Sequence, residues 1–363
     1  MRICIMRKAM RRFGGGTRLC LETIKALVKA GHRVSLLTLE PIDWSKLRDL
    51  DPSLTKPYEE VLLKVPKVKG LTPYLNILFT SLKARELRSA HDLLINLHLS
   101  ALPVPADIYY LNYSRSWIRK SKNPIKMIRS RSYISIHYYM MKTFPREGLL
   151  LTNSNYSKEA IKRYLGLEAE VVYPPVDVEF FSKALTFKKE PIVVSCGRMS
   201  PEKRFHLIPY IASKLPDVRF YIISNIVTEQ ELRYFLRIKA LIKRLAVENV
   251  RFSFGLPSAL LLLYKKASVY LHLNFEEAFG ISVPEAMAAG LIPVVPRNCG
   301  PSEIVDFGRY GYCFKDLDDC ISKIKEALNG SKDERMAVHQ RAWEYSKSRF
   351  HERLMGIVEG FVA

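Results

Sequence analysis

Short apolar runs alternate along the chain with longer segments in which apolar residues recur at helical spacing. Among the runs, Arg2–Met6, Arg33–Leu39 and Ile192–Cys196 predict strands, and Thr17–Ala30, which Gly31 ends, predicts a helix. Because the strands are apolar on both faces and helices separate them, we expect parallel sheets covered on both sides. The other predicted strands are Asp92–Leu97, Ile108–Leu111, Leu149–Thr152, Val171–Tyr173, Val218–Ser224, Val250–Phe254, Ser268–Leu273, Leu291–Val295 and Tyr312–Phe314.

The alternation pauses at Tyr173–Asp177, where two adjacent prolines favour an extended backbone. A domain boundary at this point gives one domain over residues 1–173 and another from residue 174 onward. The predicted fold class is therefore α/β, with two doubly wound Rossmann-like domains that face each other across a cleft. Since such sheets bind ligands at the carboxyl ends of their strands, we expect the functional site at the cleft.

The charge of the 363-residue chain is strongly positive and unevenly distributed. The formal net charge is +21. Residues 1–170 hold 30 Lys/Arg and 14 Asp/Glu, a balance of +16, whereas the remaining residues hold 27 and 22, a balance of +5. This asymmetry predicts an acidic partner for the first half: anionic lipid, a phosphorylated substrate or nucleic acid.

The cysteines and the lengths of the apolar runs predict the cellular location of the protein. The six cysteines form no C-x-x-C pair, which predicts reduced thiols in a cytoplasmic protein and no zinc site. No apolar run approaches the ~18 residues of a membrane span, and the apolar stretch in MRICIMRKAM is too short for a signal peptide. We therefore expect a soluble or peripheral protein.

The triple glycine Gly14–Gly16 follows the first predicted strand and precedes the first predicted helix. Glycines at such a turn let the backbone approach a ligand, and the helix N-terminus favours an anion. The spacing is not G-x-G-x-x-G, so a plain flexible turn is an equal alternative.

A second candidate follows the first strand of the second domain, in the stretch Ser195–Arg204. Arg198 lies in the loop, and Lys203 lies in the first turn of a helix for which Ser200 and Pro201 are suitable starting residues. Cations at a helix start oppose the helix dipole. A bound diphosphate would resolve that conflict; the alternative is a pair of solvated surface cations.

The third candidate is the loop Asn274–Ile281, again at the carboxyl end of a predicted strand. It contains Glu277, and Glu285 follows in the first turn of a helix that stops at Gly290. An acid at Glu285 favours the helix by itself, whereas Glu277 has no such local role. Two carboxylates near a loop with free N–H groups suit a polyhydroxylated ligand.

The stretch EAFGISVPE resembles the E-x7-E signature of retaining nucleotide-sugar glycosyltransferases of family 4, which have the GT-B fold. The resemblance extends over nearly the whole chain, through GGGTR, GRMSPEKR, AEVVYPPVDVEFF and AMAAGLIPVV in the family's order. TNSNYSKEAI and VVYPPVD look most like the mannosyltransferases that extend lipid-linked oligosaccharides on dolichol.

The resemblance implies a role for each residue around the two acids. Glu285 would bind the ribose of the donor nucleotide, and Glu277 would lie at the transferred hexose. The backbone N–H groups near that hexose would be those of Phe279, Gly280 and Ile281. Residues 1–173 would then be the acceptor-binding domain and residues 174–345 the nucleotide-sugar donor domain.

The resemblance also implies how the leaving group is held. Arg198 and Lys203 would neutralise the diphosphate, and Gly15 and Gly16 would reach it from the first domain. The C-terminal helix, within residues 346–363, would return to the N-terminal domain. Arg198, Lys203 and Glu277 are thus the predicted catalytic residues.

One departure from the family concerns a histidine that usually ends a first-domain strand close to the donor sugar. The corresponding stretch here, Ile108–Tyr113, offers Asn112. His98 lies one strand earlier and is the alternative, although a lone histidine beside an apolar run is more often structural.

The predicted function is transfer of a hexose, mannose from GDP-mannose, to a polyprenyl-linked or other glycan acceptor. Alternatives are a UDP-sugar-dependent family 4 transferase and a non-catalytic membrane- or nucleic-acid-binding protein on the same fold. No cofactor or metal is expected, because the D-x-D of Asp316–Asp318 is interpreted as a set of helix-start acids.

Residues 114–146 carry nine Lys/Arg and no acid, interleaved with aromatic and aliphatic residues. This mixture predicts docking on an anionic membrane and contact with a polyprenyl-diphosphate acceptor. The alternatives are a solvated helix face and RNA binding, but no RNA-binding motif is present, so no nucleic-acid partner is expected. The expected location is peripheral, on the cytoplasmic face of a membrane.

Overall fold

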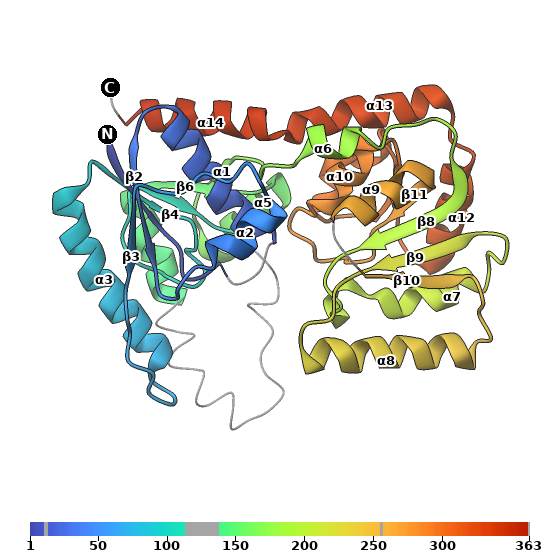
Figure 1. The fold of residues 1–363 in the computed structure, drawn as a ribbon, viewed down its shortest axis with the longest axis horizontal. Helices are drawn as coiled ribbons and strands as arrows, with labels where there is room; N and C mark the ends of the chain where they lie inside the picture. The colour runs from blue at the N-terminus through green and yellow to red at the C-terminus, as the bar shows by residue number, and fades with distance from the viewer. Residues whose placement is uncertain (11–13, 113–137, 255–256, 362–363) are drawn as a thin grey trace. The chain divides into compact units, whose positions relative to one another are not determined.

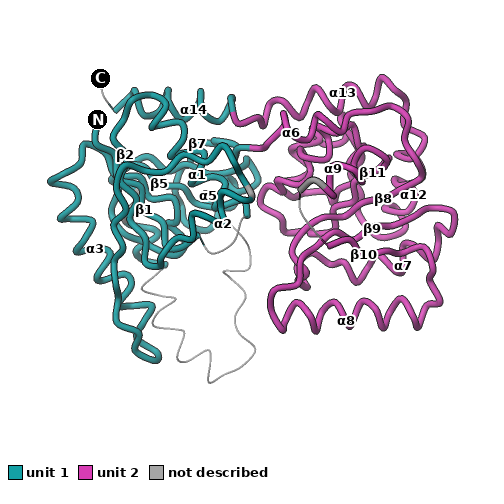
Figure 2. The backbone as a smooth tube through the Cα atoms, in the orientation of Figure 1, with its two compact units in different colours: residues 1–175, 348–363 teal, residues 176–347 magenta. Residues whose placement is uncertain are grey.

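The computed structural model describes residues 1–10, 14–112, 138–254 and 257–361. Two compact units divide the chain (Figure 2). Unit 1 comprises residues 1–175 and 348–363, and unit 2 comprises residues 176–347. The division falls within the Tyr173–Asp177 segment, and the last helix belongs to unit 1 with the N-terminal part of the chain.

Unit 1 is built on a seven-stranded sheet in the order β3-β2-β1-β4-β5-β6-β7, in which all pairs are parallel. Its strands are β1 Arg2–Met6, β2 Arg33–Thr38, β3 Glu59–Leu62, β4 Leu93–Asn96, β5 Ile108–Tyr110, β6 Leu149–Thr152 and β7 Glu170–Val171. Its helices are α1 Gly15–Lys29, α2 Trp44–Leu50, α3 Thr72–Ala90, α5 Asn155–Leu165 and α14 Lys347–Glu359, with a short 3-10 turn at η2 Phe144–Glu147.

Alternating side chains of the central strands bury against helices on both faces of the sheet in unit 1. In β1, Ile3 and Ile5 pack in a core that also contains apolar residues of α1 and α14. Cys4 and Met6 belong to the opposite core, which contains apolar residues of α3 and α5. In Figure 1, α14 lies beside α1, whereas α3 lies away from both. The two-residue period of the strand therefore places a helical layer on each side.

Unit 2 is built on a six-stranded parallel sheet in the order β10-β9-β8-β11-β12-β13. Its strands are β8 Glu190–Cys196, β9 Arg219–Ile223, β10 Val250–Ser253, β11 Ala267–Leu271, β12 Ile292–Pro296 and β13 Tyr312–Phe314. Its helices are α6 Val178–Ser182, α7 Ile208–Ala212, α8 Glu229–Arg244, α9 Pro257–Lys266, α10 Ser282–Ala288, α11 Gly300–Ile304, α12 Leu317–Leu328 and α13 Lys332–Ala342. Short 3-10 turns are η3 Pro201–Lys203, η4 Phe205–Leu207, η5 Asp306–Gly308 and η6 Trp343–Tyr345.

Two helices on one face of the second sheet begin with side-chain caps. Thr228 and Glu231 form a reciprocal capping box at the start of α8. Asp316 caps α12 by accepting a hydrogen bond from the Asp319 N–H, as expected for a helix-start acid. The apolar sides of α7, α8 and α12 share one core with the strands.

Most predicted strands agree with the structure to within two residues at each end, but β3 was missed. Its sequence, EEVL, begins with two acids, and the strand is exposed at the sheet edge beside β2. The prediction of a regular helix after Ser200 was also wrong, since a 3-10 turn stands there and Ser200 makes no side-chain cap. In the described ranges, no helix combines the length and apolarity that a membrane span requires.

Candidate functional site

The loop after β8 carries Lys203 to the carboxyl edge of the second sheet. Lys203 ends the short turn η3, and its aliphatic chain runs across Gly197. A Cβ atom on Gly197 would lie 3.3 Å from Lys203 Cε and 3.4 Å from Cδ. The absence of a side chain at Gly197 therefore gives the lysine chain its path.

Lys203 meets the loop that follows β11. Its Nζ lies 2.5 Å from Glu277 Oε2, and Asn274 Nδ2 donates to the same oxygen at 3.1 Å. The side chains of Lys203 and Glu277 are 18% and 19% exposed. The structure thus brings together two predicted site residues from loops more than seventy positions apart in the sequence.

This contact sets the protonation of the acid. Burial alone raises the pKa of Glu277, but the Lys203 ammonium, the nearby His272 ring and the hydrogen bonds from Lys203 and Asn274 outweigh it and lower the pKa to about 2. Glu277 is therefore an ionised hydrogen-bond acceptor at neutral pH, suited to sugar hydroxyl groups rather than to proton donation.

His272 was not identified from the sequence. It follows β11 directly, its backbone N–H donates to Val294, and its buried Nε2, which has no hydrogen-bond partner, lies 3.6 Å from Glu277 Oε2. Burial lowers its pKa to about 4; Glu277 opposes this and Lys203 adds to it. The signal for it in the sequence is its position near the carboxyl end of the predicted strand Ser268–Leu273.

Glu285 lies in the same unit but is placed differently from Glu277. It is buried in the first turn of α10, and its N–H donates to Ile281 at 3.3 Å. The side chain of Phe279 is buried against the ring of Tyr345, so a ligand would contact Phe279 through its backbone. Ile281 is the residue that precedes the helix.

Close packing shapes the loop between the two acids. Gly280 has φ +91°, which favours glycine, and a Cβ there would meet Pro301 Cγ at 3.0 Å and Glu277 Cγ at 3.4 Å. Gly300 at the start of α11 donates to the Glu277 carbonyl at 2.8 Å, and a Cβ on Gly300 would lie 2.0 Å from the Ala278 oxygen. The glycines are therefore required for the loop to take this path.

Arg198, the other predicted phosphate ligand, is not in the Lys203–Glu277 cluster. Its guanidinium pairs with Glu202 at 2.5 Å, and the two side chains are 65% and 53% exposed. The pair lies in one loop and turn, and such exposed pairs contribute little to stability. The side chain is therefore accessible to an anion that competes with Glu202.

Unit 1 presents its own predicted residues at the carboxyl ends of β1 and β4. Gly15 and Gly16 open α1, whose N-cap Gly14 has no capping side chain and whose first turn has no acid. The buried guanidinium of Arg7 lies against Gly16, where a Cβ would be 2.7 Å from Nη2. Arg7 was not identified from the sequence, although it directly follows the first strand.

His98 and Asn112 follow β4 and β5. The N–H of His98 donates to Asn96 Oδ1 at 3.0 Å, and its buried Nδ1 has no hydrogen-bond partner. Burial, then Arg7 and Lys8, lower the pKa of His98 to about 4. Asn112 is exposed and directly precedes residues 113–137, which lie outside the described part of the chain.

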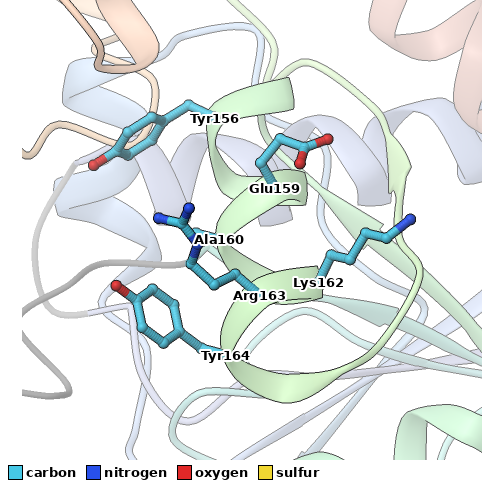
Figure 3. Close-up of a pocket in the computed structure, with 6 residues that line it drawn as sticks. All are labelled: Tyr156, Glu159, Ala160, Lys162, Arg163 and Tyr164. Atoms are coloured by element: carbon cyan, nitrogen blue, oxygen red, sulfur yellow. The ribbon is translucent and has the colours of Figure 1, made fainter.

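A cavity of about 390 Å³ lies elsewhere in unit 1, against α5 (Figure 3). Its lining does not include any predicted site residue. The residues are Tyr156, Glu159, Ala160, Lys162, Arg163 and Tyr164. We therefore place the candidate chemistry at the strand ends rather than in this cavity.

A comparison with protein families finds a match within the second unit. The family model described as "Glycosyl transferases group 1" matches residues 177–344, which contain Arg198, Lys203, Glu277 and Glu285. Residues 177–344 are therefore similar to a glycosyl transferases group 1 domain. This match supports the prediction of a glycosyltransferase over this part of the chain.

The similarity to curated relatives extends over more residues than the family model matches. A protein named GDP-Man:Man(3)GlcNAc(2)-PP-Dol alpha-1,2-mannosyltransferase from Dictyostelium discoideum is 27% identical over 257 residues, which cover 64% of this chain and 50% of that protein. The protein of the same name from Homo sapiens is 27% identical over 249 residues, 61% of this chain and 50% of its own. The chain spans about half the length of these curated relatives.

Solved structures agree over nearly the whole chain. Sucrose-phosphate synthase from Thermosynechococcus elongatus matches with a TM-score of 0.76 and 14% identity, over 99% of both chains. Anabaena Alr3699/HepE in complex with UDP has a TM-score of 0.74 and 16% identity, and covers 99% of this chain and all of its own. At these identities the likeness establishes the fold, and it confirms the predicted GT-B class with two parallel α/β sheets.

Proposed function

We propose that the protein is a retaining, metal-independent glycosyltransferase of family 4 that transfers mannose from GDP-mannose to a polyprenyl-linked glycan. The names of the relatives from Dictyostelium discoideum and Homo sapiens support the donor and the acceptor class. The observation that carries the proposal is the Lys203–Glu277 pair at the strand ends of the group 1 domain.

In this proposal Lys203 and Glu277 bind different parts of the donor when it enters the site. Lys203 Nζ turns to the diphosphate and stabilises the negative charge that grows as the glycosidic bond breaks. Glu277 stays ionised and accepts hydrogen bonds from the hexose, with Asn274 holding its Oε2 in place. Arg198 exchanges Glu202 for a phosphate oxygen, and Glu285 binds the ribose.

Retention of configuration requires attack on the face that the leaving group departs from, unless a carboxylate first forms a covalent intermediate. Glu277, with a pKa near 2 and its oxygen occupied by Lys203 and Asn274, is poorly suited to nucleophilic attack. We propose that the leaving phosphate accepts the proton of the acceptor hydroxyl during same-face transfer.

A panel of nucleotide sugars tests the donor. We expect GDP-mannose to raise the unfolding temperature of the protein more than GDP, UDP-glucose or UDP-N-acetylglucosamine, because a ligand stabilises the folded state that binds it. Transfer of radiolabelled mannose to a polyprenyl-diphosphate-linked glycan then tests the reaction. Stabilisation by a UDP-sugar with transfer of that sugar would instead establish the second candidate.

The second candidate, a UDP-sugar-dependent transferase, has a specific observation in its favour. Anabaena Alr3699/HepE, which shares the fold, was solved with UDP-glucose. A non-catalytic protein that binds membranes or nucleic acid is the third alternative, and it predicts no turnover with any donor of the panel.

We further propose that the protein is peripheral on the cytoplasmic face of an anionic membrane. Most of the predicted docking region, residues 114–146, lies outside the described residues. In its described end, residues 138–143 are helical and Tyr138 and Tyr139 are exposed. Lys142 lies over the Tyr138 ring, so cationic and aromatic groups are adjacent there.

A second surface in unit 1 supports membrane docking. Leu71, Leu78 and Leu82 are each 53–54% exposed and, with Leu75, form a stripe at helical spacing along α3. Arg85 continues the stripe by one turn, and Lys64, Lys67 and Lys69 precede it. Exposed leucines beside an excess of cations fit an anionic bilayer surface rather than a protein core.

A further inference from the structure

His272 is a buried histidine beside the Lys203–Glu277 pair, and the proposed mechanism gives it no role. It directly follows β11 and is 3% exposed. Its backbone N–H donates to the Val294 carbonyl on β12 at 2.9 Å, so the sheet fixes the point from which the ring projects. The ring atom Nε2 is buried without a hydrogen-bond partner. A buried polar atom in this state costs stability, which is unusual for a residue that serves packing alone.

The unpartnered nitrogen lies close to the acceptor that Lys203 uses. His272 Nε2 is 3.6 Å from Glu277 Oε2, slightly beyond hydrogen-bond distance. The same oxygen accepts from Lys203 Nζ at 2.5 Å and from Asn274 Nδ2 at 3.1 Å. Two donors already use this carboxylate oxygen, which explains why the imidazole lies near it without a hydrogen bond.

The charges around His272 keep its ring neutral while the ion pair is closed. Among the described residues, Glu277 and Lys203 are the charged groups that act on it. Burial lowers the pKa of His272 to about 4; Glu277 opposes this and Lys203 adds to it. If Lys203 leaves, the opposing effect of Glu277 remains and the lowering effect of Lys203 is lost. The pKa of His272 should then rise toward its ordinary value of 6.5.

We propose that His272 is a positioning residue that replaces Lys203 as the partner of Glu277 Oε2 when Lys203 moves to the diphosphate of the donor. The two atoms need to approach by only about 0.7 Å to form a hydrogen bond. Glu277 then keeps two donors, Asn274 and His272, and its carboxylate stays oriented for the hexose. This role depends on the proposed function for the event that moves Lys203, whereas the contacts among the three side chains do not.

The exchange of partners involves one proton. As Lys203 leaves, His272 takes up a proton from the solvent, and the imidazolium donates from Nε2 to Glu277. The buried carboxylate therefore has a cationic partner before and after the donor binds. A histidine suits this task because it adds no second cation while Lys203 is in place.

The ligand-free protein tests the arrangement itself. Lys203→Met removes the ammonium but keeps an aliphatic chain across Gly197. Nuclear magnetic resonance of histidine-labelled protein follows each imidazole with pH, and the signal that is lost in His272→Gln identifies His272. We expect its pKa to rise from about 4 toward 6.5 in Lys203→Met. An unchanged pKa in this variant would overturn the proposal.

Two controls separate the contact with Glu277 from a general change in the site. In Lys203→Met with Glu277→Gln the carboxylate is also absent, so the pKa of His272 should stay low. An equal rise in this double variant would contradict the role of Glu277. His206 is the internal control, because its Nδ1 hydrogen-bonds to Tyr234 and neither Lys203 nor Glu277 acts on its pKa. It should titrate at the same pH in all variants.

Binding of GDP-mannose tests the exchange. Because His272 binds its proton more tightly after Lys203 leaves, the dissociation constant should decrease by up to about tenfold between about pH 7.5 and about pH 5.5. Isothermal titration in buffers of different ionisation enthalpy should show uptake of up to one proton at the lower pH. His272→Gln keeps a hydrogen-bond donor but cannot titrate, so both effects should disappear. Their persistence in His272→Gln would overturn the proposal.

Turnover distinguishes positioning from packing. His272→Leu fills the buried space but offers no donor, and it should lower turnover by about tenfold, the effect of one hydrogen bond to a charged group. His272→Gln should lose less, and equal losses in both variants would contradict a donor role. A protein that binds no nucleotide sugar would contradict the proposed function, whereas the imidazole titration in Lys203→Met would still decide the role of His272.

Discussion

The two units differ in whether a cation at the carboxyl ends of their strands has an acidic partner. In unit 2, Lys203 and Glu277 lie 2.5 Å apart and neutralise each other, with Asn274 as a further donor. In unit 1, Arg7 has no acidic partner among the described residues, and the nearby His98 is held neutral by burial and by cations. Both cations follow parallel strands, but the charge of Lys203 is neutralised by Glu277, whereas no carboxylate of the described residues neutralises Arg7.

This difference would affect how an anion interacts with each of the two cations. Lys203 would have to leave Glu277 in order to contact an anion, so breaking this ion pair would offset part of the attraction. Arg7 has no such ion pair among the described residues, so an anion that contacted it would not have to displace a carboxylate. Variants that remove one partner from each site, or that change the pH, distinguish these two cases.

Lys203→Ala should have the largest effect. It removes the cation proposed to stabilise the leaving group and leaves the buried Glu277 carboxylate without its counter-charge. Turnover at saturating donor should fall by roughly a hundredfold or more. Lys323→Ala, which breaks the Lys323–Glu326 pair on α12, is the control and should retain full turnover. Near-normal turnover in Lys203→Ala would refute the assignment.

Arg198→Ala should follow, also with a loss of turnover of about a hundredfold. Its matched control is Arg233→Ala, because Arg233 pairs with Glu229 at the same 2.5 Å, at the same four-residue spacing, and with a similar exposure of 62%. The two variants lose equal charge and equivalent ion pairs. Steady-state kinetics with equal turnover in both would identify Arg198 as a solvated surface cation.

The two buried histidines should make folding sensitive to mild acid. The pKa of each is lowered from 6.5 to about 4, so between these values the unfolded chain binds a proton that the folded chain does not. Stability is therefore complete above pH 6.5 and falls as the pH decreases toward 4. At about pH 5 the loss should be of the order of 2 kcal/mol for each histidine.

Comparison of the two histidines sharpens the contrast between the units. His272→Gln and His98→Gln should each reduce the acid-induced decrease in the unfolding midpoint between about pH 7 and pH 5. His272 faces Glu277 and Lys203, whereas His98 faces Arg7 and Lys8. An equal midpoint decrease in both variants and in the wild type would contradict the burial argument.

The smallest expected effect concerns the surfaces of the units. Leu78→Gln with Leu82→Gln on α3 should weaken sedimentation with anionic liposomes by about tenfold, since apolar side chains contribute by leaving water. Leu232→Gln with Leu236→Gln on α8 in unit 2 is the control, because these leucines are 43% and 53% exposed at the same spacing. Equal binding of the two double variants would exclude α3 as the docking surface.

Most of the fold could be predicted because periodicity is a local property. β1 and β6 were predicted with the bounds found in the structure, and the helix of α1 was predicted with its stop at Gly31. β3 could not be recognised, because an edge strand that buries little has no apolar pattern to show. Its pairing with β2 depends on a partner more than twenty positions away.

The candidate site was predictable only in part. Lys203 and Glu277 were identified from strand-end position and from the family pattern, but nothing in the sequence indicated that they contact each other. In the sequence, His272 lies within a predicted apolar strand, and Arg7 is one of many cations in the basic half of the chain. Their importance depends on burial and on missing partners, which are properties of the folded chain.

The sequence by itself determined the alternation of strands and helices, the residue types at the strand ends, and the excess of positive charge in the first half. These properties depend on side chains a few positions apart, where periodicity and composition are already visible. Only the tertiary structure decided which charges are neutralised, because compensation depends on the distance between side chains that are remote in sequence. It placed Glu277 against Lys203 and left Arg7 buried beside Gly16 without an acid.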